Sequence, residues 1–93
     1  MKYRIFETEG FCDDLQKDFG GRKQKIKAKL RNYVYPQLRV KPRLGSNIRK
    51  LKEYSPETWR YRIGAYRFFY QIDEEEKIIF MIAAEHRKQA YRK

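Results

Sequence analysis

Three arginines in one aromatic-rich stretch have the spacing to bind an anion. Arg60 and Arg62 precede Gly64-Ala65, and Arg67 follows it. Glycine at the first central position favours a two-residue type II′ hairpin turn, and that register places Arg62 opposite Arg67 and Arg60 opposite Phe69. Like charges directly opposite each other destabilise a strand pair, so stability alone does not favour this arrangement. A phosphodiester would relieve the repulsion, because a guanidinium binds phosphate oxygens bidentately and keeps its charge.

An alternative interpretation is purely structural. Long arginine side chains can extend to solvent, or they can pair with Glu53, Glu57 or Glu85. The hairpin register does separate the side chains into two faces. One face is apolar and suited to a core, and it contains Trp59, Tyr61, Ile63, Tyr66, Phe68, Tyr70 and Ile72. The other face contains Arg60, Arg62, Arg67, Phe69 and Gln71.

The end of the chain has a second group of side chains that can act on a ligand. His86 could move a proton near neutral pH, although a lone histidine at an element boundary can equally be a capping or packing residue. In a helical turn Arg87 and Tyr91 are four residues apart and lie on one face. Tyr91 could also be a core aromatic residue.

Positive charge is concentrated in one part of the chain. The 93 residues include 23 Lys and Arg but only 12 Asp and Glu, which gives a net charge of +11. Residues 22–52 contain 12 of the basic residues and no acidic one. The helical half can be a solvated face. For the predicted loop over residues 38–52 we expect phosphate contacts, made by Arg43, Arg49, Lys50 and Lys52. The predicted partner is therefore a polyanion or an acidic protein.

The composition argues against a metal centre. Cys12 and His86 are the only cysteine and histidine in the chain, too few for a zinc site or an internal disulfide. The acidic run at residues 73–76 is expected to be a solvated hairpin loop. We therefore expect no cofactor. The start of the chain does not have the apolar run of a signal peptide, and no segment approaches about 18 apolar residues, so a cytoplasmic protein without membrane contact is expected.

The remaining elements must hold these residues in place. A first strand is predicted at residues 3–8, followed by a short helix whose apolar positions are Phe11, Leu15 and Phe19. Gly20-Gly21 is expected to end that helix in a left-handed conformation. A second helix follows, with Ile26, Leu30, Tyr33 and Val34 on its apolar side, and Pro36 is expected to end it.

The strands complete a small α+β domain. After the arginine hairpin, residues 77–84 are apolar on both faces, which predicts a strand inside the sheet. A chain of 93 residues buries one core, so residues 1–93 are predicted to form a single domain. We expect an N-terminal strand, a helical hairpin laid on the sheet, an antiparallel three-stranded meander and a short C-terminal helix, with four strands in the sheet.

This order of elements and two motifs resemble a known family. The motifs are Trp59–Tyr70 and His86–Tyr91, supported by Pro42, Gly45, Asn47, Ile48, Lys50 and Leu51. Together they resemble the RelE/ParE superfamily of type II toxin-antitoxin toxins, especially its RelE-like branch. The similarity spans nearly the whole chain and implies a RelE-like fold. It also implies an mRNA interferase that enters the A site of the small ribosomal subunit and is held inactive by an acidic antitoxin.

The resemblance also implies roles for individual residues. Arg67 matches the phosphate-binding arginine after the hairpin turn, Arg87 the arginine after the last strand, and Tyr91 the catalytic tyrosine near the end of the chain. Arg60 and Arg62 lie where RelE-like toxins often have lysines. Because arginine is a poor general base but a strong electrostatic clamp, base catalysis by this strand is in doubt.

The implied reaction is attack of a ribose 2′-OH on the adjacent phosphate, which gives a 2′,3′-cyclic phosphate without a metal ion. Arg62, Arg67 and Arg87 would stabilise the phosphorane, and Tyr91 or His86 would assist proton transfer. Two alternatives remain open. Some members of the superfamily inhibit DNA gyrase and are not nucleases, and some RelE-like proteins are inactive binding modules.

Overall fold

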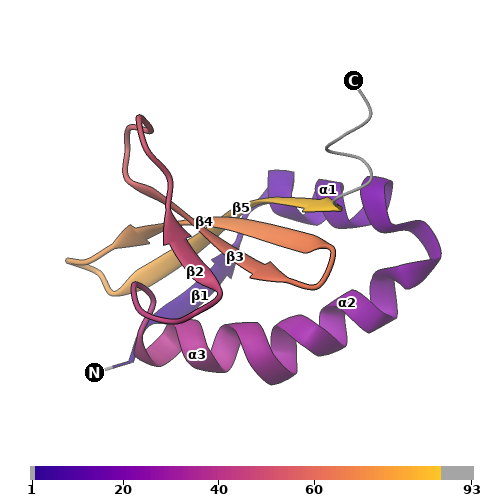
Figure 1. Ribbon diagram of the computed structural model, residues 1–93, viewed down its shortest axis with the longest axis horizontal. Helices are drawn as coiled ribbons and strands as arrows, with labels where there is room; N and C mark the ends of the chain where they lie inside the picture. Colours follow the sequence, from indigo (N-terminus) through magenta and orange to yellow (C-terminus); the bar gives the residue numbers. More distant parts are fainter. Residues whose placement is uncertain (1, 87–93) are drawn as a thin grey trace.

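The order of elements in the protein is that of an α+β fold. The structure is a computed structural model that describes the backbone of residues 2–86 and the side chains of residues 2–17 and 21–86. The elements are β1 (Arg4–Glu7), α1 (Glu9–Phe19), a 3-10 turn (Gly20–Arg22), α2 (Lys23–Lys29), a π turn (Leu30–Val34), α3 (Tyr35–Val40), β2 (Ile48–Lys50), β3 (Thr58–Ile63), β4 (Tyr66–Asp73) and β5 (Ile78–His86). Figure 1 shows their arrangement.

The sheet has five strands in the order β1-β5-β4-β3-β2, so the predicted count of four is wrong. The additional strand is β2, which lies inside the predicted loop. It pairs antiparallel with β3, with Ile48 opposite Tyr61, and Ile48 packs against the core. Strand β1 pairs parallel with β5, which makes the sheet mixed. Because β2 has three residues and only one of them, Ile48, is apolar, the sequence contains no alternating pattern that predicts a strand there.

The arginine hairpin has the predicted register. Ile63 lies opposite Tyr66, Arg62 opposite Arg67, and Arg60 opposite Phe69. The turn also has the expected form, because Gly64 adopts a positive φ of 60° and Ala65 does not, as in a type II′ turn.

Strand β5 lies between β1 and β4, which confirms that it is internal. It continues to His86, so Glu85 and His86 belong to the strand and not to a separate tail. The predicted C-terminal helix, and with it Arg87 and Tyr91, falls outside the described residues.

The first helix begins earlier than its apolar positions alone indicate. Thr8 caps it, because the Thr8 Oγ1 atom accepts a hydrogen bond from the Phe11 backbone N–H at 3.3 Å. Phe11 and Leu15 are buried as expected. At the other end the chain passes through the 3-10 turn Gly20–Arg22, so the helix does not end in a left-handed conformation at Gly21.

Pro36 does not end the second helix, which continues to Val40. A π turn directly precedes the proline, and in it the Tyr35 N–H donates to the Leu30 carbonyl five residues earlier. This wider turn relieves the clash that a proline ring causes in a regular helix. Pro36 then occupies the first turn of α3, where its missing N–H group is not needed.

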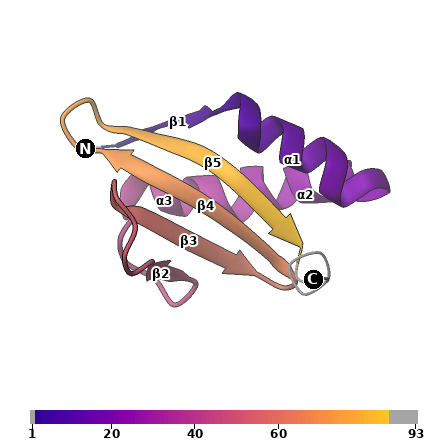
Figure 2. The same cartoon turned by 90° about the horizontal axis from the view of Figure 1, so that it is seen from above.

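The core lies between the helices and one face of the sheet. Figure 1 shows α2 and α3 running beneath the sheet, and Figure 2 shows α1 on the side of β1 and β5. The buried helix residues recur every four positions: Ile26, Leu30, Val34 and Leu38. The π turn has more residues per turn, which keeps this spacing in line with the core and turns Tyr33 outward. Tyr33, predicted on the apolar side, is 61% exposed.

On the other face of the sheet, none of the helices within residues 2–86 covers the strands (Figure 1). In Figure 1 the connection between β2 and β3 rises on that side, away from α2 and α3. We call this side the outer face; Arg60, Arg62, Arg67 and Phe69 belong to it by register. No helix within residues 2–86 is long and apolar enough to cross a membrane.

Candidate functional site

Two rows of side chains bring the arginines together on the outer face. In the first row Arg49 on β2 lies opposite Arg60 on β3, which lies opposite Phe69 on β4. In the second row Arg62 lies opposite Arg67, which lies opposite Glu85 on β5. The predicted cluster is therefore formed, and β2 adds Arg49 to it.

An open groove of about 440 Å³ runs along this cluster. We call it the arginine groove, and its lining residues are Ser46, Asn47, Ile48, Arg49, Arg60, Arg62 and Gly64. None of these residues has a carboxylate side chain. Two hydrogen bonds fix its wall: Asn47 Nδ2 donates to the Arg62 carbonyl at 2.8 Å, and the Arg62 N–H donates to the Asn47 carbonyl at 2.9 Å.

Arg60 combines partial burial with several cationic neighbours. Its Nε atom is buried and has no hydrogen-bond partner among the described residues. Burial lowers the pKa of Arg60, and the neighbouring charges of Arg49, Arg62 and Arg67 lower it further. An anion in the arginine groove would supply the missing counter-charge.

Arg67 already has a carboxylate beside it. Its Nε atom lies 3.7 Å from Glu85 Oε1 across β4 and β5. The ion pair proposed in the structural interpretation of the hairpin arginines is thus present at Arg67, and the exposed Arg62 side chain fits the other half of that interpretation, extension to solvent. An anion that approached Arg67 would do so next to Glu85, whose side chain is 44% exposed.

His86 lies on the other face of the sheet from the arginines. It is opposite Tyr66, whose side chain is buried on the helix side. The two rings make an edge contact with centroids 4.9 Å apart. This contact matches the packing role that the sequence left open. Arg87 and Tyr91 cannot be placed, because they lie outside the described residues.

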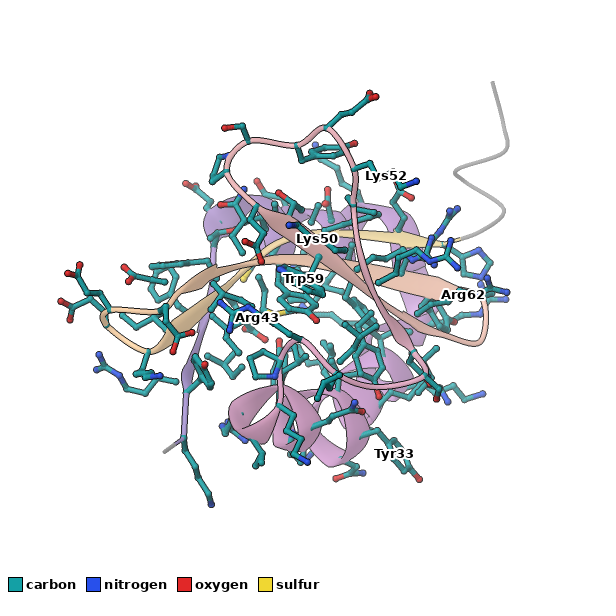
Figure 3. The ribbon with its side chains drawn as sticks, turned by 60° about the vertical axis from the view of Figure 1, so that its left-hand side comes forward. Tyr33, Arg43, Lys50, Lys52, Trp59 and Arg62 are labelled. Carbon is teal, nitrogen blue, oxygen red and sulfur yellow. The ribbon has the colours of Figure 1, made fainter. Side chains whose placement is uncertain are left out.

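The other predicted phosphate contacts are dispersed. Figure 3 shows Arg43 and Arg62 toward different ends of the sheet, with Lys50 and Lys52 nearer the β2–β3 connection. Arg43 pairs with Glu74 at 3.0 Å and lies 3.7 Å from Glu57. Lys50 and Lys52 are exposed. The roles predicted for these three residues stay predictions, and a phosphate at Arg43 would have to compete with two carboxylates.

Sequence reasoning missed the residues that frame the groove. Ser46 and Asn47 line it, and Asn47 holds β3 in place, but the sequence had pointed to Asn47 only through the family resemblance and to Ser46 not at all. The Gly45-Ser46-Asn47 run before Ile48 was the available signal, because turn residues commonly precede a strand. Among residues 2–86 no three His, Cys, Asp or Glu side chains gather as metal ligands would.

Several solved structures share this fold. The chain superposes on the RelBE2 toxin-antitoxin complex of Mycobacterium tuberculosis with a TM-score of 0.74 and 24% identity, over 94% of this chain and 100% of that one. An archaeal RelE-RelB complex from Pyrococcus horikoshii OT3 gives 0.66 and 20%, over 94% and 97%. A mutant E. coli RelE toxin in the free state gives 0.66 and 22%, over 97% and 88%.

Sequence comparison places the chain in a family. None of the curated proteins compared with this chain matches its sequence. The family described as "ParE toxin of type II toxin-antitoxin system, parDE" matches residues 12–91, which is most of the chain. The solved structures agree with that match in fold. The chain therefore belongs to the ParE toxin family of type II toxin-antitoxin systems, within the RelE/ParE superfamily.

Proposed function

We propose that this toxin is a ribosome-dependent mRNA endonuclease of the RelE type. The observation that carries the proposal is the arginine groove, an open cationic surface whose lining residues include no carboxylate. A site built to bind a polyanionic strand needs such uncompensated charge. The likeness in fold to RelE toxins supports the same assignment.

The proposed reaction transfers the phosphate within the RNA strand. The 2′-oxygen of one nucleotide forms a bond to the adjacent phosphorus, and the bond from that phosphorus to the 5′-oxygen of the next nucleotide breaks. The products are a 2′,3′-cyclic phosphate and a 5′-hydroxyl. One proton leaves the 2′-OH and one reaches the departing oxygen. Arg62, Arg67 and Arg87 stabilise the extra negative charge on the phosphorane, with no metal ion in the reaction.

Proton transfer is the weaker part of this site. A guanidinium stays protonated, so Arg60 and Arg62 bind charge and do not act as bases. By family resemblance Tyr91 assists the transfer. His86, which contacts Tyr66 on the helix side, would have to leave that contact to reach the RNA. A toxin without a strong base relies on correct orientation of its substrate, and we assign that orientation to the ribosomal A site.

The proposed protein partner is an acidic antitoxin. Several structural neighbours are complexes of a RelE toxin with RelB. A net charge of +11 favours a segment of opposite charge, which we expect to fold as it covers the helical hairpin and the sheet. Opposite charge steers the encounter, so the association rate should fall as salt rises, and the dissociation rate should change much less. Stopped-flow mixing with the neighbouring gene's product tests this: a salt-independent association rate contradicts it.

A second candidate function is inhibition of DNA gyrase. The family description that matches residues 12–91 names ParE and not RelE, which is the observation in its favour. DNA is also a polyanion, so the arginine groove alone does not separate the two functions. The nucleic acid that is cut in the cell, mRNA or DNA, does separate the two functions.

Mapping RNA and DNA ends after induction of the toxin is the deciding experiment. We expect new mRNA 5′ ends, with a 5′-hydroxyl, inside translated reading frames and only during translation. Arg67→Ala is the matched control and should remove these ends. Double-strand DNA breaks without new mRNA ends would indicate gyrase inhibition in place of the nuclease. The absence of both kinds of damage would indicate an inactive binding module.

A further inference from the structure

The outer face has a second hollow, next to the arginine groove. It has a volume of about 270 Å³ and lies between the β2–β3 connection on one side and strands β4 and β5 on the other. Leu51 and Tyr54 contribute from the connection, and Phe69 contributes from β4. Gln71 and Glu85 are polar groups in its lining. We call it the aromatic hollow.

Hydrogen bonds fix the connection over the strands. Gln71 Nε2 donates to Thr58 Oγ1 at 3.3 Å, and Thr58 Oγ1 donates to the Pro56 carbonyl at 2.9 Å. Thr58 is buried, so water competes little for these bonds. The Leu51 N–H also donates to the Thr58 carbonyl at 2.9 Å. The hollow is therefore formed before any ligand arrives, although Tyr54 at its rim remains 61% exposed.

The hollow and the arginine groove share a border. Phe69 of the hollow lies opposite Arg60 of the groove, and Glu85 of the hollow lies opposite Arg67. Along β4, Phe69 is two residues from Arg67, a distance of about 7 Å. A strand of nucleic acid with a phosphate on the arginines would thus have an attached base within reach of the hollow.

We propose that the aromatic hollow receives one unpaired base of the RNA strand whose phosphates lie in the arginine groove. This inference rests on the proposed function and names the part of the substrate that the site reads. A base has an apolar face and a polar edge. Aromatic side chains such as Phe69 and Tyr54 stack on the face, and a carboxylate accepts hydrogen bonds from an amino group on the edge. Glu85 therefore favours a base with an exocyclic amino group over uracil.

Fluorescence anisotropy with a labelled nine-nucleotide RNA tests this proposal. The probe is used intact and with an abasic residue at each position in turn. Five proteins are compared: wild type, Tyr54→Ala, Arg62→Ala, Tyr33→Ala and Glu85→Gln. Tyr33 is the matched control, because it is as exposed as Tyr54, 61%, but lies on the helix side of the molecule (Figure 3).

For the wild-type protein one abasic position should weaken binding on the order of tenfold. Tyr54→Ala should reduce the difference between the intact and abasic probes, because Phe69 alone is left to stack on the base, and Tyr33→Ala should behave as wild type. Arg62→Ala should weaken the binding of both probes by the same factor and keep their difference. Uracil at the sensitive position should bind less tightly than adenine, cytosine or guanine, and Glu85→Gln should reduce that preference.

The two proposals fail in different ways. Equal binding of all abasic probes by the wild-type protein, or equal loss for every probe in Tyr54→Ala, overturns the aromatic hollow. If Arg62→Ala still weakens binding, the arginine groove and the proposed function survive that result. If Arg62→Ala binds RNA as tightly as wild type, or if wild type binds no probe, both proposals are wrong.

Discussion

The sheet uses arginine in two different ways at its two ends. Near the β4–β5 turn, Arg43 pairs with Glu74 and lies near Glu57, and Lys77 pairs with Glu74 as well. Near the Gly64 turn, Arg60 lies between the cationic residues Arg49 and Arg62, with no carboxylate in the groove that they line. We call these regions the paired end and the arginine end.

Their pKa values differ in direction for this reason. Burial acts to lower the pKa of Arg43, but hydrogen bonds from Arg43 to Glu74 and between Arg43 and Tyr3 outweigh it and raise that pKa. Burial also lowers the pKa of Arg60, and there Arg49, Arg62 and Arg67 add to the effect. Charge at the paired end thus stabilises the fold. Charge at the arginine end is retained against repulsion, which is typical of a binding or catalytic surface.

The comparison predicts its largest difference in activity. Arg67→Ala should reduce cleavage of ribosome-bound mRNA on the order of 10²-fold or more, because it removes a fixed charge aimed at the transition state. Arg43→Ala removes the same side chain from the paired end. Because Glu74 and Glu57 already compete for that guanidinium, the loss of its predicted phosphate contact should change the cleavage rate by no more than about twofold. Initial rates of 5′-end formation on programmed ribosomes measure both.

Circular dichroism and thermal melting of both variants supply the control. Arg67→Ala should remain folded, because Arg67 lies on the outer face and not in the core. A folded Arg67→Ala protein that cleaves at the wild-type rate would contradict the catalytic assignment of the arginine end. Equal losses in Arg67→Ala and Arg43→Ala would show that the two ends do not differ in function.

A second prediction concerns ribosome binding. Lys50 and Lys52 are exposed and belong to residues 22–52, a stretch without any acidic residue. We therefore assign both lysines to contacts with ribosomal RNA. Replacing both with Ala should weaken ribosome binding and lower the logarithmic salt slope by roughly one for each lost phosphate contact. Lys77→Ala is the matched change at the paired end and should leave the slope as it is.

The cut position should not move in the Lys50 and Lys52 variant at saturating ribosome concentration. Mapping of 5′ ends measures this separately from affinity. A shifted cleavage pattern would place these lysines on the substrate and would extend the arginine end toward the β2–β3 connection.

The sequence was sufficient for the part of the site that depends on local pattern. A glycine turn and strict alternation set the hairpin register, so the positions of Arg60, Arg62 and Arg67 were predictable. Arg49 was not, because β2 is a three-residue strand whose place depends on Ile48 packing against the core. The π turn before Pro36 was not predictable either, since local rules favour a helix end there.

Contacts between residues far apart in the sequence could not be predicted either. Arg43 and Glu74 are 31 residues apart, and only the fold shows that they meet. The aromatic hollow likewise joins the β2–β3 connection to β4 and β5, and no sequence pattern relates Tyr54 to Phe69. Side chains within one hairpin could be assigned from the sequence, whereas those that meet across elements could not.

A third prediction compares stability at the two ends. Arg62→Ala should leave the free energy of unfolding unchanged or raise it by some tenths of a kcal/mol, because it removes a like charge opposite Arg67. Arg43→Ala should lower that free energy, because it leaves Glu74 and Glu57 with fewer partners. Urea denaturation with a common slope for all proteins measures the difference. A clear loss of stability in Arg62→Ala would mean that the arginine end is structural after all.

The smallest expected effect is a pH dependence at the paired end. Hydrogen bonds from Lys77, Tyr3 and Arg43 lower the pKa of Glu74 from 4.5 to about 2. A carboxyl whose pKa is lower in the folded state stabilises the fold fully above its unfolded pKa, and this contribution is lost as the pH falls toward the folded pKa. Glu74→Gln should therefore be slightly less stable than wild type at pH 7. The gap should shrink from about pH 4.5 downward and vanish near pH 2.

Urea titrations of wild type and Glu74→Gln at pH 7, 4 and 2.5 test this dependence, with Glu75→Gln as the control. Glu75 is the neighbouring exposed carboxylate and takes part in none of the ion pairs of Arg43 and Lys77. A gap between wild type and Glu74→Gln that stays constant over this range would show that the neighbours of Glu74 do not lower its pKa in the folded protein. The contrast with the arginine end would then rest on geometry alone. A gap that closes with falling pH would show that the cations of the paired end are neutralised by the fold itself. Of these two ends, the arginine end is then the one whose charge is available to bind RNA.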